Sequence, residues 1–152
     1  MKMKSHVLHI LLSISLTLLI ASAIATVYFR ATLTNTGSII AHGCKVYLED
    51  ETTESYSVNW GDIAVNSSAI QYRWIHNNGT GANVEWGHDA PSYLQPKIYY
   101  EQPVDTWNLW DPGTLLSFSQ GQWLHIKLEL TSLPDAINHI GSFHFNTYIE
   151  LT

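Results

Sequence analysis

Cysteine is nearly absent from this chain of 152 residues, since Cys44 is its single thiol. One cysteine excludes a disulfide within the chain, although a disulfide between two chains stays open. Cys44 stands two residues before Val46 and four before Leu48. This alternation predicts that Cys44 is a small apolar side chain directed into the core of a sheet.

Basic side chains are the second scarce class, because seven Lys and Arg stand against 13 Asp and Glu, for a net charge of −6. Lys2 and Lys4 precede the first apolar run, so residues 26–152 keep five basic and 13 acidic side chains, a net charge of −8. This balance argues against nucleic acid and anionic lipid as partners. Neutral polar and aromatic residues take the place of charge, which is typical of an extracellular β domain.

Patterns of catalytic residues are also missing. The chain has no Gly-x-Ser-x-Gly elbow and no Ser or Cys in a recognisable nucleophile context. The histidines beyond the N-terminal run have no His-x-His or His-x-x-x-His spacing, so we expect no metal site and no cofactor. The acidic run 49–51 lacks the phasing of a calcium loop and predicts a solvated hairpin tip. We expect no enzyme activity, and an exported hydrolase is kept only as a class that activity on a broad substrate panel would revive.

The longest apolar run covers residues 7–25, which carry no formal charge and follow the two lysines. A cleaved signal peptide needs a basic start, an apolar stretch and small residues at the cleavage site. Ala23-Ile24-Ala25 supplies them for cleavage before Thr26, and Ala21-Ser22-Ala23 offers a second site. Residues 7–29 are also long enough to span a bilayer as a retained anchor helix. Both interpretations place residues 26–152 outside the cytoplasm, either released or held at the cell surface.

Beyond residue 30 the apolar pattern has a period of two, with no helical stripe. In residues 122–130 four aliphatic side chains share one face and three polar ones share the other, which indicates a strand with one buried side. Residues 143–151 repeat this pattern. The sequence therefore predicts an all-β fold: a single antiparallel β-sandwich of Ig-like or jelly-roll type, with about seven to nine strands, behind an N-terminal hydrophobic helix. The domains are residues 1–25 and residues 26–152.

Turn signals separate the expected strands. Asn35-Thr36-Gly37 is one of them, so we expect one strand to end at residue 34 and another to begin at residue 38. Residues 133–141 are expected to form one helical turn or a loop between sheets. His125 and His144 fall on outward strand faces and could be cross-strand neighbours. The remaining expected strands are residues 56–60, 69–76, 83–86, 96–101 and 115–119.

Six tryptophans are many for this length. Trp60, Trp74, Trp86 and Trp123 fall in expected strands, where core packing explains them. Trp107 and Trp110 lie in a loop-like run, residues 103–112, beside Asp and Asn side chains. They could cover one open end of the sandwich, stack on sugar rings of a cell-surface glycan, or contact a neighbouring subunit, since aromatic residues are enriched at interfaces.

Two positions match the N-glycosylation pattern Asn-x-Ser/Thr. Asn66 is followed by Ser67-Ser68 and Asn78 by Gly79-Thr80, and both stretches have the composition of turns. The pattern predicts that these two asparagines are exposed, and it makes a glycan on each a hypothesis.

Several short sequence motifs occur in a fixed order over residues 36–151. A Gly-x-Ile start at Gly37 is followed by Trp60-Gly61, by Asn77-Asn78-Gly79 and by Ser142-Phe-His-Phe145. This order resembles a group of short exported archaeal proteins. The resemblance implies a single β-sandwich behind a signal or anchor helix, and it carries no established activity. The chain departs from the group at Ala64-Val65-Asn66, where a Pro-Gly turn is common, and in its Trp-rich stretch 103–112.

More distantly, the chain is similar to the sandwich subunits of camelysin-like and biofilm-matrix fibres. In those fibres an extended N-terminal segment of one subunit completes the sheet of the next. Residues 26–34 are the matching segment here, because Val27, Phe29, Ala31 and Leu33 alternate with polar or aromatic side chains. This segment could be the domain's own first strand, or it could add to a neighbour and drive self-assembly. We thus expect a structural or adhesive surface protein, with a carbohydrate-binding module that uses Trp107 and Trp110 as the alternative.

Overall fold

The computed structural model describes residues 32–139 and 141–152. The expected signal or anchor segment, the hydrophobic helix and the boundary after residue 25 lie outside these residues. Over the part of the chain that is described, no helix is long and apolar enough to cross a membrane. Thr32–Thr152 forms one compact unit.

The described chain is almost entirely β-strand, as the alternating pattern predicts. It contains ten strands and one short 3-10 helix, against the seven to nine strands expected. In chain order these are β1 (Thr32–His42), β2 (Cys44–Tyr47), β3 (Ser57–Ala64), β4 (Ser68–Asn77), β5 (Asn83–His88), β6 (Leu94–Glu101), β7 (Trp107–Trp110), β8 (Leu116–Ser117), β9 (Trp123–Ser132), η1 (Pro134–Asn138) and β10 (Ser142–Leu151). Of the two alternatives for residues 133–141, a helical turn or a loop, the structure has the helical turn, η1.

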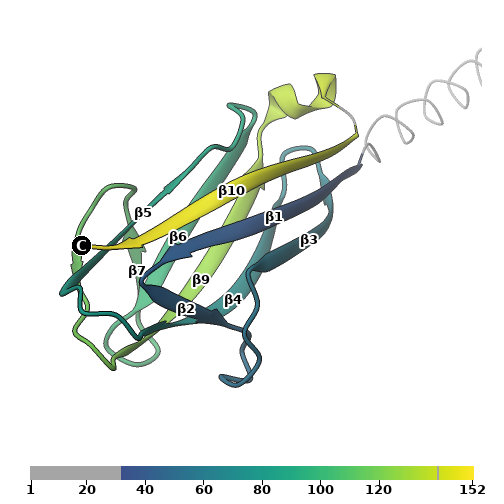
Figure 1. Ribbon diagram of the computed structural model, residues 1–152. Coiled ribbons are helices and arrows are strands. Elements are labelled where there is room, and N and C mark those ends of the chain that lie inside the picture. Colours follow the sequence, from purple (N-terminus) through teal and green to yellow (C-terminus); the bar gives the residue numbers. More distant parts are fainter. Residues whose placement is uncertain (1–31, 140) are drawn as a thin grey trace, which may run out of the picture. The chain divides into compact units, whose positions relative to one another are not determined.

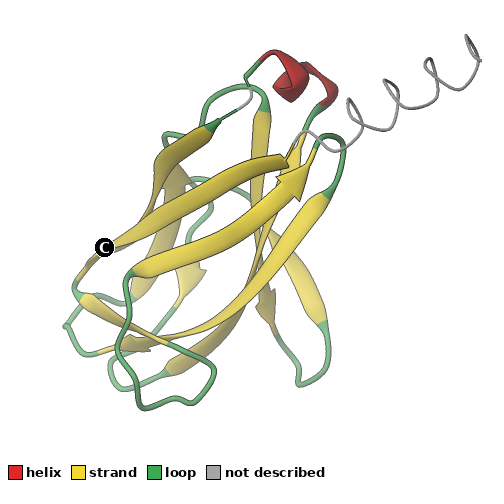
Figure 2. Ribbon diagram, turned by 90° about the vertical axis from the view of Figure 1, so that its right-hand side faces the viewer, coloured by secondary structure: helices red, strands yellow, loops and turns green. Residues whose placement is uncertain are grey.

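The strands form two five-stranded sheets, which lie as two layers (Figures 1 and 2). Sheet A has the order β3-β1-β10-β5-β8, and sheet B has the order β2-β4-β9-β6-β7. Alternate residues of each sheet point into the space between the layers. On β9, Ile126, Leu128 and Leu130 are buried there, as expected, and Cys44 is 5 % exposed at the start of β2. The chain is therefore a β-sandwich with one shared core.

The sheets are mostly antiparallel, but β1 and β10 run parallel side by side in sheet A (Figure 1). Their register extends from Thr34 opposite Ser142 to His42 opposite Glu150. On its other edge β1 pairs antiparallel with β3. The expectation of a purely antiparallel sandwich is thus wrong at this one pair, because alternation along a strand does not encode the direction of its neighbour.

The turn expected at Asn35-Thr36-Gly37 is wrong, since these residues continue through β1. The strand instead has a bulge between Asn35 and Thr36, where its register against β3 shifts. Gly37 serves packing, because a Cβ there would lie 3.0 Å from the indole nitrogen of Trp60. The real break comes at Gly43, whose φ of 77° lets the chain leave sheet A and enter sheet B.

The edge strand β3 has its outward carbonyls occupied by side chains of sheet B. Arg73 Nη2 donates to the Ser57 carbonyl at 3.2 Å, and Gln71 Nε2 donates to the Asn59 carbonyl at 3.2 Å. Arg73 is only 6 % exposed, and burial lowers its pKa. These two donors take the positions that an added strand would need, so they protect this edge from pairing with another chain.

Candidate functional site

The outer face of sheet B carries a row of rings that we name the aromatic band. It crosses the sheet from β2 to β7 and has no covering element among the described residues. Its most exposed member is Trp123, which is 43 % exposed. The band consists of Tyr47, Tyr72, Trp74, His76, Tyr99, Trp107, Trp123 and His125.

The rings of the aromatic band pack against one another across neighbouring strands. Trp74 and His125 stack with centroids 4.3 Å apart and planes at 8°, and His76 stacks on Trp123 at 4.4 Å. Trp107 lies 5.0 Å from His125. Such cross-strand pairs stabilise a sheet, so the band is first of all a packed surface with ring edges and the Trp123 side chain open to solvent.

A hydrogen bond between an imidazole and a carboxylate is built into the band. His125 Nδ1 lies 2.7 Å from Glu101 Oε2, and the two side chains are 20 % and 15 % exposed. The backbone N–H of Asp105 and the imidazole of His125 hydrogen-bond this carboxylate and lower the pKa of Glu101. The pair ties β9 to the end of β6 on this outer face, where it orients the imidazole that Trp74 stacks on.

Trp107 and Trp110 occupy different environments. The run 103–112, expected to be loop-like, contains strand β7. Trp107 is half-buried in the aromatic band, whereas Trp110 is 1 % exposed and donates from its indole nitrogen to the Thr114 carbonyl at 2.7 Å. Trp110 is therefore a side chain of the core, and it cannot stack on a surface ligand in this fold.

The expectation that Trp74 and Trp123 belong to the core is wrong, because both point outward on β4 and β9. The signal was present in the sequence: Trp123 has the same strand parity as His125, which the alternation already placed outward. Trp60 and Trp86 are buried, as expected, at 6 % and 3 % exposure. His125 and His144 are not neighbours, since they lie in sheet B and sheet A.

The outer face of sheet A is polar instead. Asp89 accepts hydrogen bonds from the backbone and side chain of Asn146 at 2.6 and 2.8 Å and from the hydroxyl of Tyr148 at 2.9 Å. Ser38 donates to the Asn146 amide oxygen at 2.6 Å. The bonds from Asn146 and Tyr148 keep the pKa of Asp89 below its usual value and fasten the segment after β5 onto β10.

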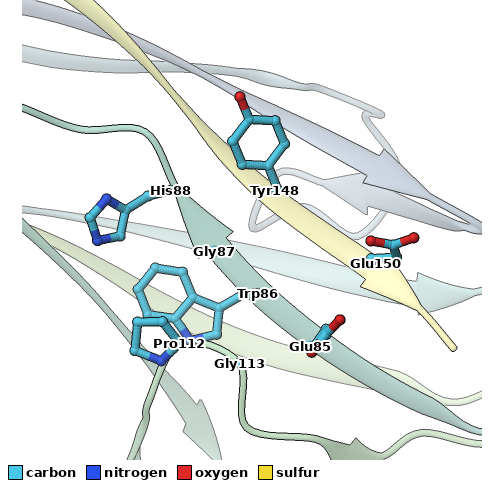
Figure 3. A pocket seen from close by; sticks show the side chains of 8 residues that line it. All are labelled: Glu85, Trp86, Gly87, His88, Pro112, Gly113, Tyr148 and Glu150. Carbon is cyan, nitrogen blue, oxygen red and sulfur yellow. The ribbon is translucent and has the colours of Figure 1, made fainter.

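A cavity of about 490 Å³ opens beside this polar face, over β5 and β10 (Figure 3). Its lining is Glu85, Trp86, Gly87, His88, Pro112, Gly113, Tyr148 and Glu150. His88 Nδ1 accepts from the Ala90 N–H at 3.2 Å, so its other ring nitrogen is the one that can donate. Sequence reasoning did not find this cavity, because its walls come from three distant segments with no motif of their own.

The acidic turn after β2 uses its carboxylate to shape the backbone. Asp50 accepts from the N–H groups of Thr52 and Thr53 and from the Thr53 hydroxyl. These bonds lower the pKa of Asp50 to about 2. Over the described part of the chain no three His, Cys, Asp or Glu side chains come together as a metal ion would require.

We predict that Asp50 makes the turn sensitive to acid. Because its pKa is lower in the folded chain than the ordinary value of 3.8, its stabilising effect is full above about pH 4 and is lost as the pH falls toward 2. In Asp50→Asn, the decrease in the thermal unfolding midpoint between these two pH values is expected to be smaller than in the wild type. Thermal unfolding followed by circular dichroism checks this, and an unchanged acid slope would contradict it.

Both glycosylation candidates have exposed side chains. Asn66 sits between β3 and β4 with a φ of 60°, and Asn78 follows β4. The exposure that the pattern predicts is confirmed at both positions, and the glycans themselves stay a prediction.

Comparisons with known proteins leave the family open. No family model matches the chain, and no curated protein matches it. Among solved structures, the ASH / PapD-like domain of human CEP192 (PapD-like domain 7) is 12 % identical over 58 % of this chain and 74 % of that chain, with a TM-score of 0.16. At that score the likeness carries no argument.

Proposed function

We propose that this chain is a non-catalytic surface protein that works outside the cytoplasm as a structural or adhesive subunit. The apolar N-terminal run, the low cationic charge and the resemblance to exported archaeal sandwich proteins support this role. On this proposal the fold is of Ig-like or jelly-roll type, the domain is either secreted or held by its N-terminal helix, and Asn66 and Asn78 carry glycans.

The observation that carries the subunit role is the position of β1. This strand opens the described chain, yet it lies in the interior of sheet A with β3 on one edge and β10 on the other. Its partners on β10 are about a hundred residues away in the sequence. If the chain hinged at Gly43 and β1 left the sheet, the facing edges of β3 and β10 would be unpaired. The β1 strand of a second copy could then pair with both. We propose that residues 26–34 are exchanged in this way together with β1, which begins at Thr32.

A pair of engineered cysteines tests the exchange. Ser38 and Asn146 face each other across β1 and β10, and their side chains are hydrogen-bonded at 2.6 Å. In a Cys44→Ala background, Ser38→Cys with Asn146→Cys should form a disulfide between chains if β1 is exchanged. Intact mass and non-reducing electrophoresis of assembled protein should then show a ladder of linked chains.

The control pair joins two strands that are not exchanged. Ser68 on β4 and Thr131 on β9 face each other, with hydroxyl oxygens 2.8 Å apart. Ser68→Cys with Thr131→Cys should close within one chain in the same background. If both cysteine pairs form disulfides within a single monomeric chain, β1 is not exchanged between chains. It would then be the domain's own first strand.

Carbohydrate binding through exposed tryptophans is the second candidate function. The exposure of Trp123 and the outward position of Trp107 favour it, whereas the burial of Trp110 removes that residue from the proposed site. Trp107→Ala combined with Trp123→Ala should abolish retention on immobilised polysaccharide while the far-ultraviolet circular dichroism is unchanged. A wild-type chain that no polysaccharide retains would end this candidate.

A further inference from the structure

Gly87 is the next-to-last residue of β5, and it has no local reason to be glycine. Its φ lies outside the left-handed region, and a Cβ built on it would meet no atom within 4 Å. Neither backbone conformation nor packing therefore requires glycine there. Glycine inside a strand lowers stability, and it often marks a place where a ligand approaches the backbone closely. At Gly87 the space that is kept open is the floor of the 490 Å³ cavity (Figure 3).

Two carboxylates form one wall of this cavity. Glu85 and Glu150 are directly opposite each other on β5 and β10. Among the described residues neither has a basic partner within ion-pair distance. Like charges in this cross-strand position repel each other, and carboxylates only accept hydrogen bonds. The wall is therefore suited to a ligand that brings several hydrogen-bond donors.

The opposite wall is apolar and rigid. Pro112 and Trp86 lie together there (Figure 3). Trp86 is 3 % exposed, with its indole nitrogen fixed by a bond of 2.7 Å to the Trp110 carbonyl, so Pro112 presents the apolar surface of this wall. A second cavity, of about 330 Å³, shares Trp86, His88 and Pro112 with the first and continues toward Lys97. Apolar surface facing a few convergent polar groups is the usual composition of a small-molecule site.

We propose that this cavity binds one residue of an oligosaccharide. Sugar hydroxyls donate to Glu85 and Glu150, the C–H face of the ring lies on Pro112, and Gly87 lets the ring approach the strand. The adjoining cavity takes the next sugar residue. This site is on the opposite sheet from the aromatic band, and it does not depend on the exchange of β1.

Titration calorimetry of the purified full chain with gluco-, manno- and chito-oligosaccharides tests the site. At least one series should bind. Gly87→Val should weaken that binding by at least about tenfold, because its side chain fills the floor. Its thermal midpoint should stay equal or rise, since valine suits a strand better than glycine. Ser142→Val, an exposed position on β10 outside the cavity, is the matched control and should bind as wild type does.

Three results would overturn the proposal. Failure of all three oligosaccharide series to bind would remove it, whatever the state of assembly. Sugar binding could also be unchanged in Gly87→Val and lost in the double variant Trp107→Ala with Trp123→Ala. This result would show that the sugar binds to the aromatic band instead. Binding of spermidine or calcium that Gly87→Val removes, with no sugar bound, would show a cation site instead.

Discussion

Replacing Trp110 by alanine is expected to lower the free energy of unfolding by about 3–5 kcal/mol. The indole is 1 % exposed, and its loss leaves a cavity between the sheets together with an unpaired Thr114 carbonyl. The free energy of unfolding of domains of this size is about 5–15 kcal/mol, so this substitution would remove a large part of it. Urea unfolding followed by circular dichroism measures the loss.

Trp107→Ala is the control for this prediction, since it removes the same side chain three residues earlier. Trp107 is only partly buried on the outer face, so we expect a loss of about 1–2 kcal/mol from its ring contacts with Tyr72 and His125. Equal losses for the two variants would contradict the assignment of Trp110 to the core and Trp107 to the surface.

Asn77→Asp is expected to destabilise the fold strongly at neutral pH. The Asn77 side chain is fully buried, and its amide nitrogen donates to the carbonyls of Gly81 and Phe118 at 2.9 and 2.5 Å. A carboxylate has no donor for either carbonyl and would be buried without a positive partner. We expect a loss of about 3–5 kcal/mol, the cost of an uncompensated buried charge.

The pH dependence of this variant gives a second readout. Burial beside two carbonyls would raise the pKa of the new carboxyl in the folded chain above its value of about 3.9 in the unfolded chain. At low pH the carboxyl group at position 77 is protonated, and its hydroxyl can donate to one of the two carbonyls. This stabilising hydrogen bond would be lost as the pH rises through the raised pKa. The stability gap between wild type and Asn77→Asp should therefore narrow toward pH 4, and a gap independent of pH would contradict this account.

Local alternation was sufficient to predict much of this fold. The inward face of β9 and the burial of Cys44 follow from period-two patterning, which is a property of neighbouring residues. The placement of β1 could not be predicted, because its pairing with β10 joins positions such as Ser38 and Asn146 that are 108 residues apart. Direction and order of strands are properties of such distant contacts.

The candidate sites show the same limit. Trp123 could have been placed outward from its parity with His125, whereas Trp74 lies on a strand where apolar side chains occur on both faces, so only the packing of sheet A over sheet B decides that Trp74 points outward. Gly37 and Asn35 resemble a turn in the sequence, yet Gly37 is needed by the approach of Trp60 and Asn35 borders a bulge. The cavity at Gly87 depends on Pro112 coming to lie beside β5, which no local pattern encodes.

The most direct test of the proposed role is the mass and assembly state of the native protein. Intact mass spectrometry and negative-stain electron microscopy of cell-surface extracts measure both. The account predicts a chain that begins at Thr26 and is found in regular fibres. An uncleaved chain that is monomeric in the membrane fraction would contradict the subunit role.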